Sequence, residues 1–179
     1  GIAAAAVNGL GIVGANPRAL IMPVKVMDDD GTGNIATIVK GINYAAARGA
    51  DVISMSFGGG NISNAEIEAL ENAYITSVLV ASAGNNAYEI YNFMYGLYYP
   101  AAYYCVLGTQ STFDTFGHLS PFSDYDPDGP VYSRCDISLQ LGRVRDPSVI
   151  YGINYEVKAP GSLILSTVPG GKYALYSGT

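Results

Sequence analysis

The first part of the chain alternates short apolar runs with segments of helical periodicity. The apolar run at residues 19–27 predicts a strand. In residues 34–48, apolar side chains recur at the three- and four-residue spacing of one helix face, and Gly49 ends the predicted helix. Such alternation is typical of βαβ units, in which helices cover a sheet of parallel strands.

The same unit repeats in the residues that follow. Residues 52–57 and 78–83 each predict a strand, and residues 63–76 predict the helix between them. Ser63 stands at the N-cap position of that helix, and Glu66 completes a capping box three residues later. We therefore predict an α/β fold: a three-layer, mostly parallel, doubly wound sheet with helices on both faces.

The periodic pattern weakens in the second half of the chain. Residues 105–109 predict one more strand, and residues 157–159 and 164–168 indicate strands near the end. Residues 124–149 are rich in Asp, Pro, Gly and Arg, which predicts an inserted surface loop. At 179 residues, the chain is expected to form one domain that carries this insert.

Composition and charge exclude several classes of protein. Hydrophobic residues make up 49% of the chain and charged residues 13%, which is typical of a protein with a packed core. The net charge of -6 would repel phosphate backbones, so nucleic-acid binding is excluded. No apolar run reaches the roughly 20 residues that cross a bilayer, and no signal-peptide pattern opens the sequence.

Cysteine and tyrosine usage leaves two questions open. Cys105 lies in an apolar run and is typical of a buried thiol, but a disulfide with Cys135 also fits the sequence. The chain has 15 tyrosines and no tryptophan. Many of the tyrosines gather in one stretch, which predicts either a loop packed by its own rings or a surface for a partner. The clustered residues are Tyr88, Tyr91, Tyr95, Tyr98, Tyr99, Tyr103 and Tyr104.

Two segments match the glycine spacing of a dinucleotide-binding loop, GLGIVG at residues 9–14 and GTGNIA at residues 31–36. The second follows a predicted strand and opens a predicted helix, and Asp51 lies about 20 residues further on. However, Asp51 begins its predicted strand, and the run DDD at residues 28–30 would place negative charge beside a pyrophosphate. The pattern therefore disfavours nucleotide binding.

Two polar residues are candidates for chemistry. His118 is the only histidine, which excludes a metal site with several histidine ligands. It could form a catalytic triad with Asp124 and a serine. A surface or packing role for His118 is favoured. Asn85 follows the apolar run VLVASAG. Its amide could donate to an oxygen that gains negative charge at the open end of a parallel sheet, or it could simply occupy a turn.

Six motifs, in order along the chain, resemble the subtilisin-like (S8) serine protease family. They are DVISMSFGG, VLVASAGN, YPAA, LSPFSDY, YEVKAPG and LSTVPGGKYALYSGT. Together with residues 22–26 they cover nearly the whole chain except the tyrosine-rich stretch and the 124–149 insert. The resemblance implies that residues 1–179 are part of a catalytic domain, lying between the family's catalytic histidine motif and its catalytic serine motif. The first strands, the catalytic Asp and His and the serine-bearing helix are then expected outside this chain.

The resemblance also implies roles for individual residues. Asn85 matches the asparagine that stabilises the tetrahedral oxyanion, and Thr179 matches its threonine neighbour. Two further segments match those that pair with the substrate backbone and line the pocket for the P1 residue, which precedes the scissile bond. Their residues are Ser56, Phe57, Gly58, Ala81, Ser82 and Gly84. Phe57 stands where leucine is common and Ser82 where alanine is common, so the P1 preference stays open.

The implied activity is hydrolysis of polypeptides by Ser/His/Asp acyl transfer, without a catalytic cofactor. These 179 residues alone are expected to be inactive and to be poorly stable. Asn8, in VNGLGI, resembles a ligand of a structural calcium ion, with an ordinary Asn-Gly turn as the alternative. An extracellular or secreted location and a prodomain partner are implied by the family only.

The alternative function is a non-catalytic subtilisin-like surface or binding module. In that case the tyrosine-rich stretch would contact a partner protein. The residues flanking the chain distinguish the two functions, because a protease requires a histidine before it and a serine after it.

Overall fold

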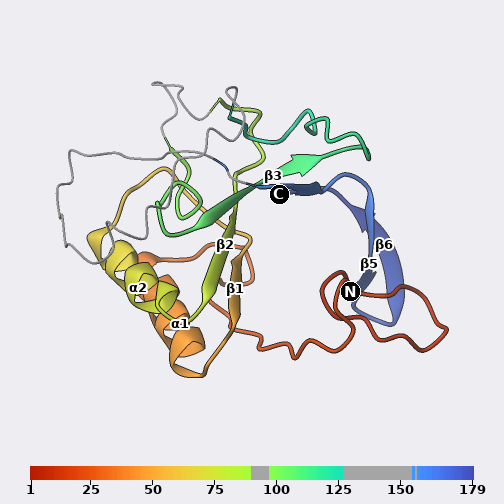
Figure 1. Cartoon of the computed structure of the whole chain (residues 1–179), viewed down its shortest axis with the longest axis horizontal. Helices are drawn as coiled ribbons and strands as arrows, with labels where there is room; N and C mark the ends of the chain where they lie inside the picture. The colour runs from red at the N-terminus through yellow and green to blue at the C-terminus, as the bar shows by residue number, and fades with distance from the viewer. Residues whose placement is uncertain (90–96, 127–154, 156) are drawn as a thin grey trace.

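A computed structural model of the chain describes residues 1–89, 97–126, 155 and 157–179. Four strands form one parallel sheet in the order β1-β2-β3-β4, and two more form an antiparallel hairpin (Figure 1). The sheet strands are β1 (Val52–Met55), β2 (Val78–Ser82), β3 (Leu107–Thr112) and β4 (Val157–Pro160). The hairpin strands are β5 (Ile164–Val168) and β6 (Lys172–Tyr176), and the helices are α1 (Ile35–Ala47) and α2 (Asn64–Tyr74). The predicted α/β class with a mostly parallel sheet is confirmed.

Local sequence signals start both helices. The side chain of Asn34 accepts a hydrogen bond from the backbone N–H of Thr37 at 2.9 Å, and Ser63 accepts one from Glu66 N at 3.4 Å. These bonds satisfy donors that the first helical turn leaves unpaired. Neither described helix is long and apolar enough to cross a membrane.

The two helices pack against each other and lie on the same face of the sheet (Figure 1). Ile53 and Met55 of β1 point into the core that the helices cover, whereas Val52, on the opposite face, is 56% exposed. Val78 and Leu107 are exposed as well. The described helices therefore cover one face, and a helical layer on the second face stays a prediction.

The predicted strand at residues 19–27 is wrong. The structure has no regular element there, and Leu20 is 98% exposed. Val24 and Val26 still pack against the core, so the apolar signal is real. A strand, however, needs a neighbour that shares its ladder of hydrogen bonds, and no described segment pairs with these residues.

Two strand assignments near the end of the chain differ from the prediction. Val106 N donates to Tyr103 O at 3.0 Å, so the chain is still turning at 105–106 and β3 begins only at Leu107. β6 was not predicted. Its signal is the pair Gly170 and Gly171, whose φ values of 80° and 70° suit the tight turn that joins β5 to β6.

The expected surface insert does not begin at Asp124. Asp124 and Asp126 are each only 3% exposed, and Asp124 hydrogen-bonds to a distant part of the chain. Residues 127–149 lie outside the described residues, so the surface insert stays a prediction for them. Cys135 lies outside them too, and Cys105 is buried, so the disulfide stays untested.

A buried acidic group links α2 to the turn before β3. Tyr103 Oη donates to Glu66 Oε2 at 3.0 Å and accepts from Ser63 N at 3.0 Å. Glu66 is 3% exposed. Burial raises the pKa of Glu66, and the hydrogen bond from Tyr103 only partly opposes this rise.

This carboxyl predicts a pH dependence of stability. Because the folded pKa of Glu66 lies above the unfolded value, near 4.5, the folded state holds this proton more tightly. The contribution of the protonated Glu66 to the stability of the fold is fully present below pH 4.5, and it is lost as the pH rises through the folded pKa. Urea unfolding of the full-length protein should show wild type losing stability relative to Glu66→Gln over this window. For Glu68→Gln, an exposed change on the same helix, the free energy of unfolding should follow the same pH dependence as in wild type. If Glu66→Gln also follows the wild-type pH dependence, the prediction is wrong.

Candidate active site

Two of the predicted substrate-binding segments leave the sheet at the same edge. Met55 of β1 lies opposite Ala81 of β2 in parallel register, so residues 56–58 and residues 83–85 both continue from the carboxyl ends of adjacent strands. Ligands of open parallel sheets bind at this edge. The sheet topology therefore brings together residues that the sequence analysis connected only through motifs.

The chain end returns to this edge through the β5–β6 hairpin. Gly178 N donates to Gly161 O at 2.8 Å, directly after β4, and Leu163 N donates to Ser177 Oγ at 2.9 Å. Figure 1 shows the C-terminus beside β3 and β4. The hairpin thus delivers Thr179 to the open end of the sheet.

Asn85 and Thr179 are hydrogen-bonded although 94 residues separate them. Asn85 Oδ1 accepts from Thr179 N at 2.9 Å and from Thr179 Oγ1 at 3.0 Å. Thr179 Oγ1 in turn accepts from Gly84 N at 3.2 Å. The structure therefore brings the two residues expected at the oxyanion site into direct contact.

These bonds fix which way the Asn85 amide faces. A backbone N–H can only donate, so the atom facing Thr179 N must be the amide oxygen. The Nδ2 group then points the other way, and within the described residues it has no hydrogen-bond partner. It lies close to Gly178, since a methyl group added there would be 3.7 Å from Asn85 Nδ2. An exposed N–H donor at this edge is suited to stabilise negative charge on a bound oxygen.

Asp124 anchors the loop that carries Asn85, a role that sequence analysis missed. Its Oδ1 accepts from Asn86 N at 2.8 Å and from Tyr88 N at 2.9 Å, and its Oδ2 accepts from Asn86 Nδ2 at 3.3 Å. Asp124 N donates to Gly84 O at 3.0 Å. The carboxylate of Asp124 therefore holds the residues after Asn85, and its backbone N–H holds Gly84 before it.

Further backbone bonds extend this contact. Ala87 N donates to Phe122 O and Tyr125 N donates to Tyr88 O, each at 2.9 Å. Ala87 has a φ of 57°, a left-handed conformation that alanine adopts only at a cost. The loop after Asn85 is thus held in a specific shape by residues 122–125.

The remaining predicted substrate-binding residues differ in exposure. Ser56 and Gly58 are exposed, and Phe57 packs partly against the core. Ala81 lies inside the core and Ser82 is also buried, so either one could line a substrate site mainly through its main chain. Gly84 is buried under Asp124, with which an added methyl group would collide.

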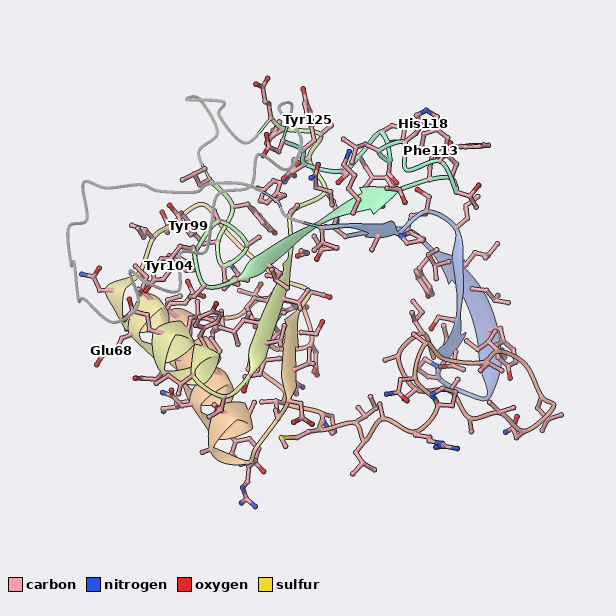
Figure 2. The ribbon with its side chains drawn as sticks, in the orientation of Figure 1. Glu68, Tyr99, Tyr104, Phe113, His118 and Tyr125 are labelled. Carbon is pink, nitrogen blue, oxygen red and sulfur yellow. The ribbon has the colours of Figure 1, made fainter. Side chains whose placement is uncertain are left out.

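The structure does not assemble a triad around His118. His118 Nδ1 lies 2.5 Å from Asp114 Oδ2, and Asp124 is engaged elsewhere. Both the histidine and Phe113, on which its ring stacks, lie on the loop beyond β3 (Figure 2). No serine hydroxyl of the described chain is hydrogen-bonded to His118, which favours a surface role.

The described residues support neither the calcium site that the resemblance implied nor the nucleotide site that the sequence pattern disfavoured. Asn8 Oδ1 accepts from Leu10 N at 3.0 Å in an exposed turn, and no group of three or more acidic, His or Cys side chains suited to a metal is found in the described part. In the GTGNIA segment, Asp28 Oδ1 accepts from Asp30 N at 3.1 Å and Thr32 N at 2.8 Å. A carboxylate therefore already occupies backbone donors that a phosphate would need.

The chain is similar to a set of known proteins. The model of the subtilase family, Peptidase_S8, matches residues 1–179. Thermitase of Thermoactinomyces vulgaris is 36% identical over 182 residues, which cover 100% of this chain and 53% of that protein. A protein of Paenibacillus polymyxa named intracellular serine protease is 33% identical over 180 residues, which cover 100% of this chain and 47% of that protein.

The structure is similar to solved structures as well. Sphericase superposes with a TM-score of 0.72 and 25% sequence identity, and the match covers 95% of this chain and 52% of that one. The chain spans about half the length of the curated relatives it matches.

Proposed function

Because this chain belongs to the subtilase family of peptidases, we propose that the protein from which it comes is a serine endopeptidase that cleaves polypeptides. The observation that carries the proposal is the contact between Asn85 and Thr179 at the carboxyl edge of the sheet. A subtilase needs an amide donor beside its nucleophile, and the bonds between Asn85 Oδ1 and Thr179 support this role for Asn85, because the nucleophile is expected directly after Thr179.

In the proposed mechanism, a serine directly after Thr179 attacks the carbonyl carbon of the scissile bond. A histidine that precedes this chain, oriented by an aspartate, takes the serine proton and passes it to the leaving amine. The carbonyl oxygen becomes an oxyanion, and Asn85 Nδ2 donates a hydrogen bond to it. Asp124 acts indirectly by holding the loop of Asn85 in place.

We also propose that these 179 residues have no peptidase activity alone. The one histidine, His118, is exposed and paired with Asp114, and it makes no hydrogen bond with Asn85 or Thr179. The uncovered apolar side chains Val52 and Val78 support the expectation of low stability, because the missing part of the domain would cover such a face.

The substrate is proposed to be an extended polypeptide that contacts residues 56–58 and 82–84. No catalytic cofactor is needed, because acyl transfer uses side chains only. A calcium site at Asn8 is not supported, since its oxygen is engaged in an Asn-Gly turn. A prodomain remains an expectation, and so does an extracellular location, because one relative is named an intracellular protease.

The described tyrosines of the cluster differ, because Tyr88 and Tyr104 are exposed whereas two others pack inward. Tyr99 and Tyr103 pack on each other with ring centroids 4.5 Å apart, and Tyr103 is buried. This favours a loop packed by its own rings. Tyr91 and Tyr95 lie outside the described residues.

The proposed function can be tested on the full-length protein. We expect it to hydrolyse denatured casein, and we expect a serine-directed organophosphorus reagent to abolish the activity by labelling the residue after Thr179. Replacement of that serine with alanine is the control, and it should remove both activity and labelling. A folded full-length protein that has no serine there, or that is not labelled, would overturn the proposal in favour of a binding module.

A further inference from the structure

The ring of Tyr98 lies between the two glycines that border the expected P1 site. A methyl group added to Gly58 would be 2.8 Å from Tyr98 Cδ1 and even closer to Cε1. A methyl group added to Gly84 would be 3.4 Å from the same Cδ1 atom. One edge of the ring therefore approaches both main-chain segments, which come from different strands.

The backbone around Tyr98 is fixed in this position. The next residue, Tyr99, exchanges two hydrogen bonds with Gly59, from Tyr99 N to Gly59 O and from Gly59 N to Tyr99 O, both at 2.8 Å. Gly58 is directly before Gly59, so this bridge sets the ring of Tyr98 against Gly58. The pairing holds the two backbones side by side, and in the observed rotamer of Tyr98 the ring lies against Gly58.

The position of Asn85 shows which substrate residue meets this ring. An oxyanion bound by Asn85 Nδ2 belongs to the carbonyl group of the P1 residue. The side chain of that residue leaves the chain one atom before the carbonyl carbon, and Gly84 is the immediate neighbour of Asn85. With Gly58 and Gly84 expected at the P1 site from the family resemblance, a P1 side chain is expected to enter the space between them, where Tyr98 lies against Gly58 and the Asp124 carboxyl lies against Gly84.

We propose that Tyr98 is a specificity-determining residue that restricts the P1 residue to small side chains such as alanine, glycine and serine. The inference rests on the proposed function. Burial, together with the negative charge of Asp124, raises the pKa of Tyr98, so the group that fills the site is a neutral phenol at physiological pH. A small apolar side chain can contact this ring, whereas a phenylalanine side chain would occupy the same volume.

The test is the P1 preference of the full-length enzyme, measured as kcat/KM on peptides that differ only at P1. Since a single methylene in a pocket changes kcat/KM by roughly 10-fold or more, wild type should cleave after alanine at least about 10-fold better than after phenylalanine. Tyr98→Ala should raise kcat/KM for the phenylalanine peptide by about 10-fold or more. The alanine peptide should change by less than about threefold, since its side chain does not need the vacated volume.

Two control variants separate ring volume from other effects. Tyr98→Phe keeps the ring and should keep the wild-type preference, which shows that volume and not the hydroxyl sets it. Tyr44→Ala makes the same truncation at an exposed position on α1 and should leave the preference unchanged. If Tyr98→Ala does not fold, the sites at which wild type cleaves a peptide library still test the proposal. The proposal requires small P1 residues at those sites.

The outcomes distinguish this inference from the proposed function. If wild type cleaves no peptide at all, the proposed function fails. If wild type cleaves but favours large P1 residues, or if Tyr98→Ala leaves the ratio of the two peptides unchanged, the role of Tyr98 is wrong while the peptidase stands.

Discussion

Replacing Asn85 with alanine in the full-length protein is expected to lower kcat by about 10²–10³ and to leave KM nearly unchanged. The magnitude is the one established for this oxyanion donor in subtilisin itself, and we carry it over to this chain. Asn85 Nδ2 has no partner among the described residues, so its hydrogen bond is available to the oxyanion. A donor used mainly in the transition state alters turnover far more than substrate binding.

Asn85→Asp separates catalysis from structure. An aspartate has nearly the same shape and can still accept hydrogen bonds from Thr179 N and Thr179 Oγ1, but it has no N–H group to offer. It should therefore lose at least as much kcat as Asn85→Ala, because its negative charge also repels the oxyanion, while keeping the contact between the two segments. The asparagine exchange Asn16→Ala, in the N-terminal loop, should leave kcat unchanged.

Steady-state kinetics and thermal unfolding of the same preparations check this prediction. If Asn85→Asp keeps full kcat, Asn85 does not act as a donor. If kcat and the affinity for substrate fall together, Asn85 contributes uniform binding or holds the fold, and the oxyanion role is wrong.

The parts of the fold that were predicted correctly depend on local signals. α1 and α2 each follow an N-cap side chain, Asn34 and Ser63, that satisfies the first turn from within a few residues. The strands β1 and β2 are short apolar runs between turns. The run at residues 19–27 carries the same signal, but it is not a strand because pairing depends on a neighbour and not on the run itself.

The candidate site was only partly accessible from the sequence. Asn85 could be located because it closely follows the apolar run that forms β2 and because VLVASAGN resembles a family motif. Its contact with Thr179 depends on the β5–β6 hairpin, and β6 was not predicted. Asp124 was assigned to a surface loop because the residues after it are rich in Asp, Pro and Gly. The N–H groups that it binds lie 36 and 38 residues away, so no local pattern could reveal them.

Replacing Asp124 with alanine is expected to lower both stability and turnover of the full-length protein. The variant would take the buried acceptor away from Asn86 N and Tyr88 N, whose bonds to Asp124 are partly buried. We expect a loss of about 2 kcal/mol in the free energy of unfolding, the size expected for partly buried bonds to a charged group. We also expect kcat to fall by about 10- to 10²-fold, because a displacement of roughly 1 Å in a catalytic group has effects of this order.

Asp114→Ala provides the matched control for this prediction. Asp114 also anchors a loop, accepting from Phe116 N at 3.1 Å and His118 N at 3.0 Å, but it has no contact with the loop of Asn85. Its replacement should lower stability without changing kcat once the folded fraction is matched. Asp124→Asn, which keeps one acceptor oxygen for the backbone N–H groups, should restore most of kcat.

The measurement is therefore a comparison of kcat, KM and urea unfolding across these three variants. A fall in kcat confined to Asp124→Ala, with KM nearly constant and rescue by Asp124→Asn, supports a positioning role that acts through Asn85. Equal kcat values for Asp124→Ala and Asp114→Ala, per folded molecule, would show that Asp124 only stabilises the fold. Both aspartates accept hydrogen bonds from two backbone N–H groups, but only those bound by Asp124 belong to the loop of Asn85, so an effect on turnover confined to Asp124 variants points to that loop.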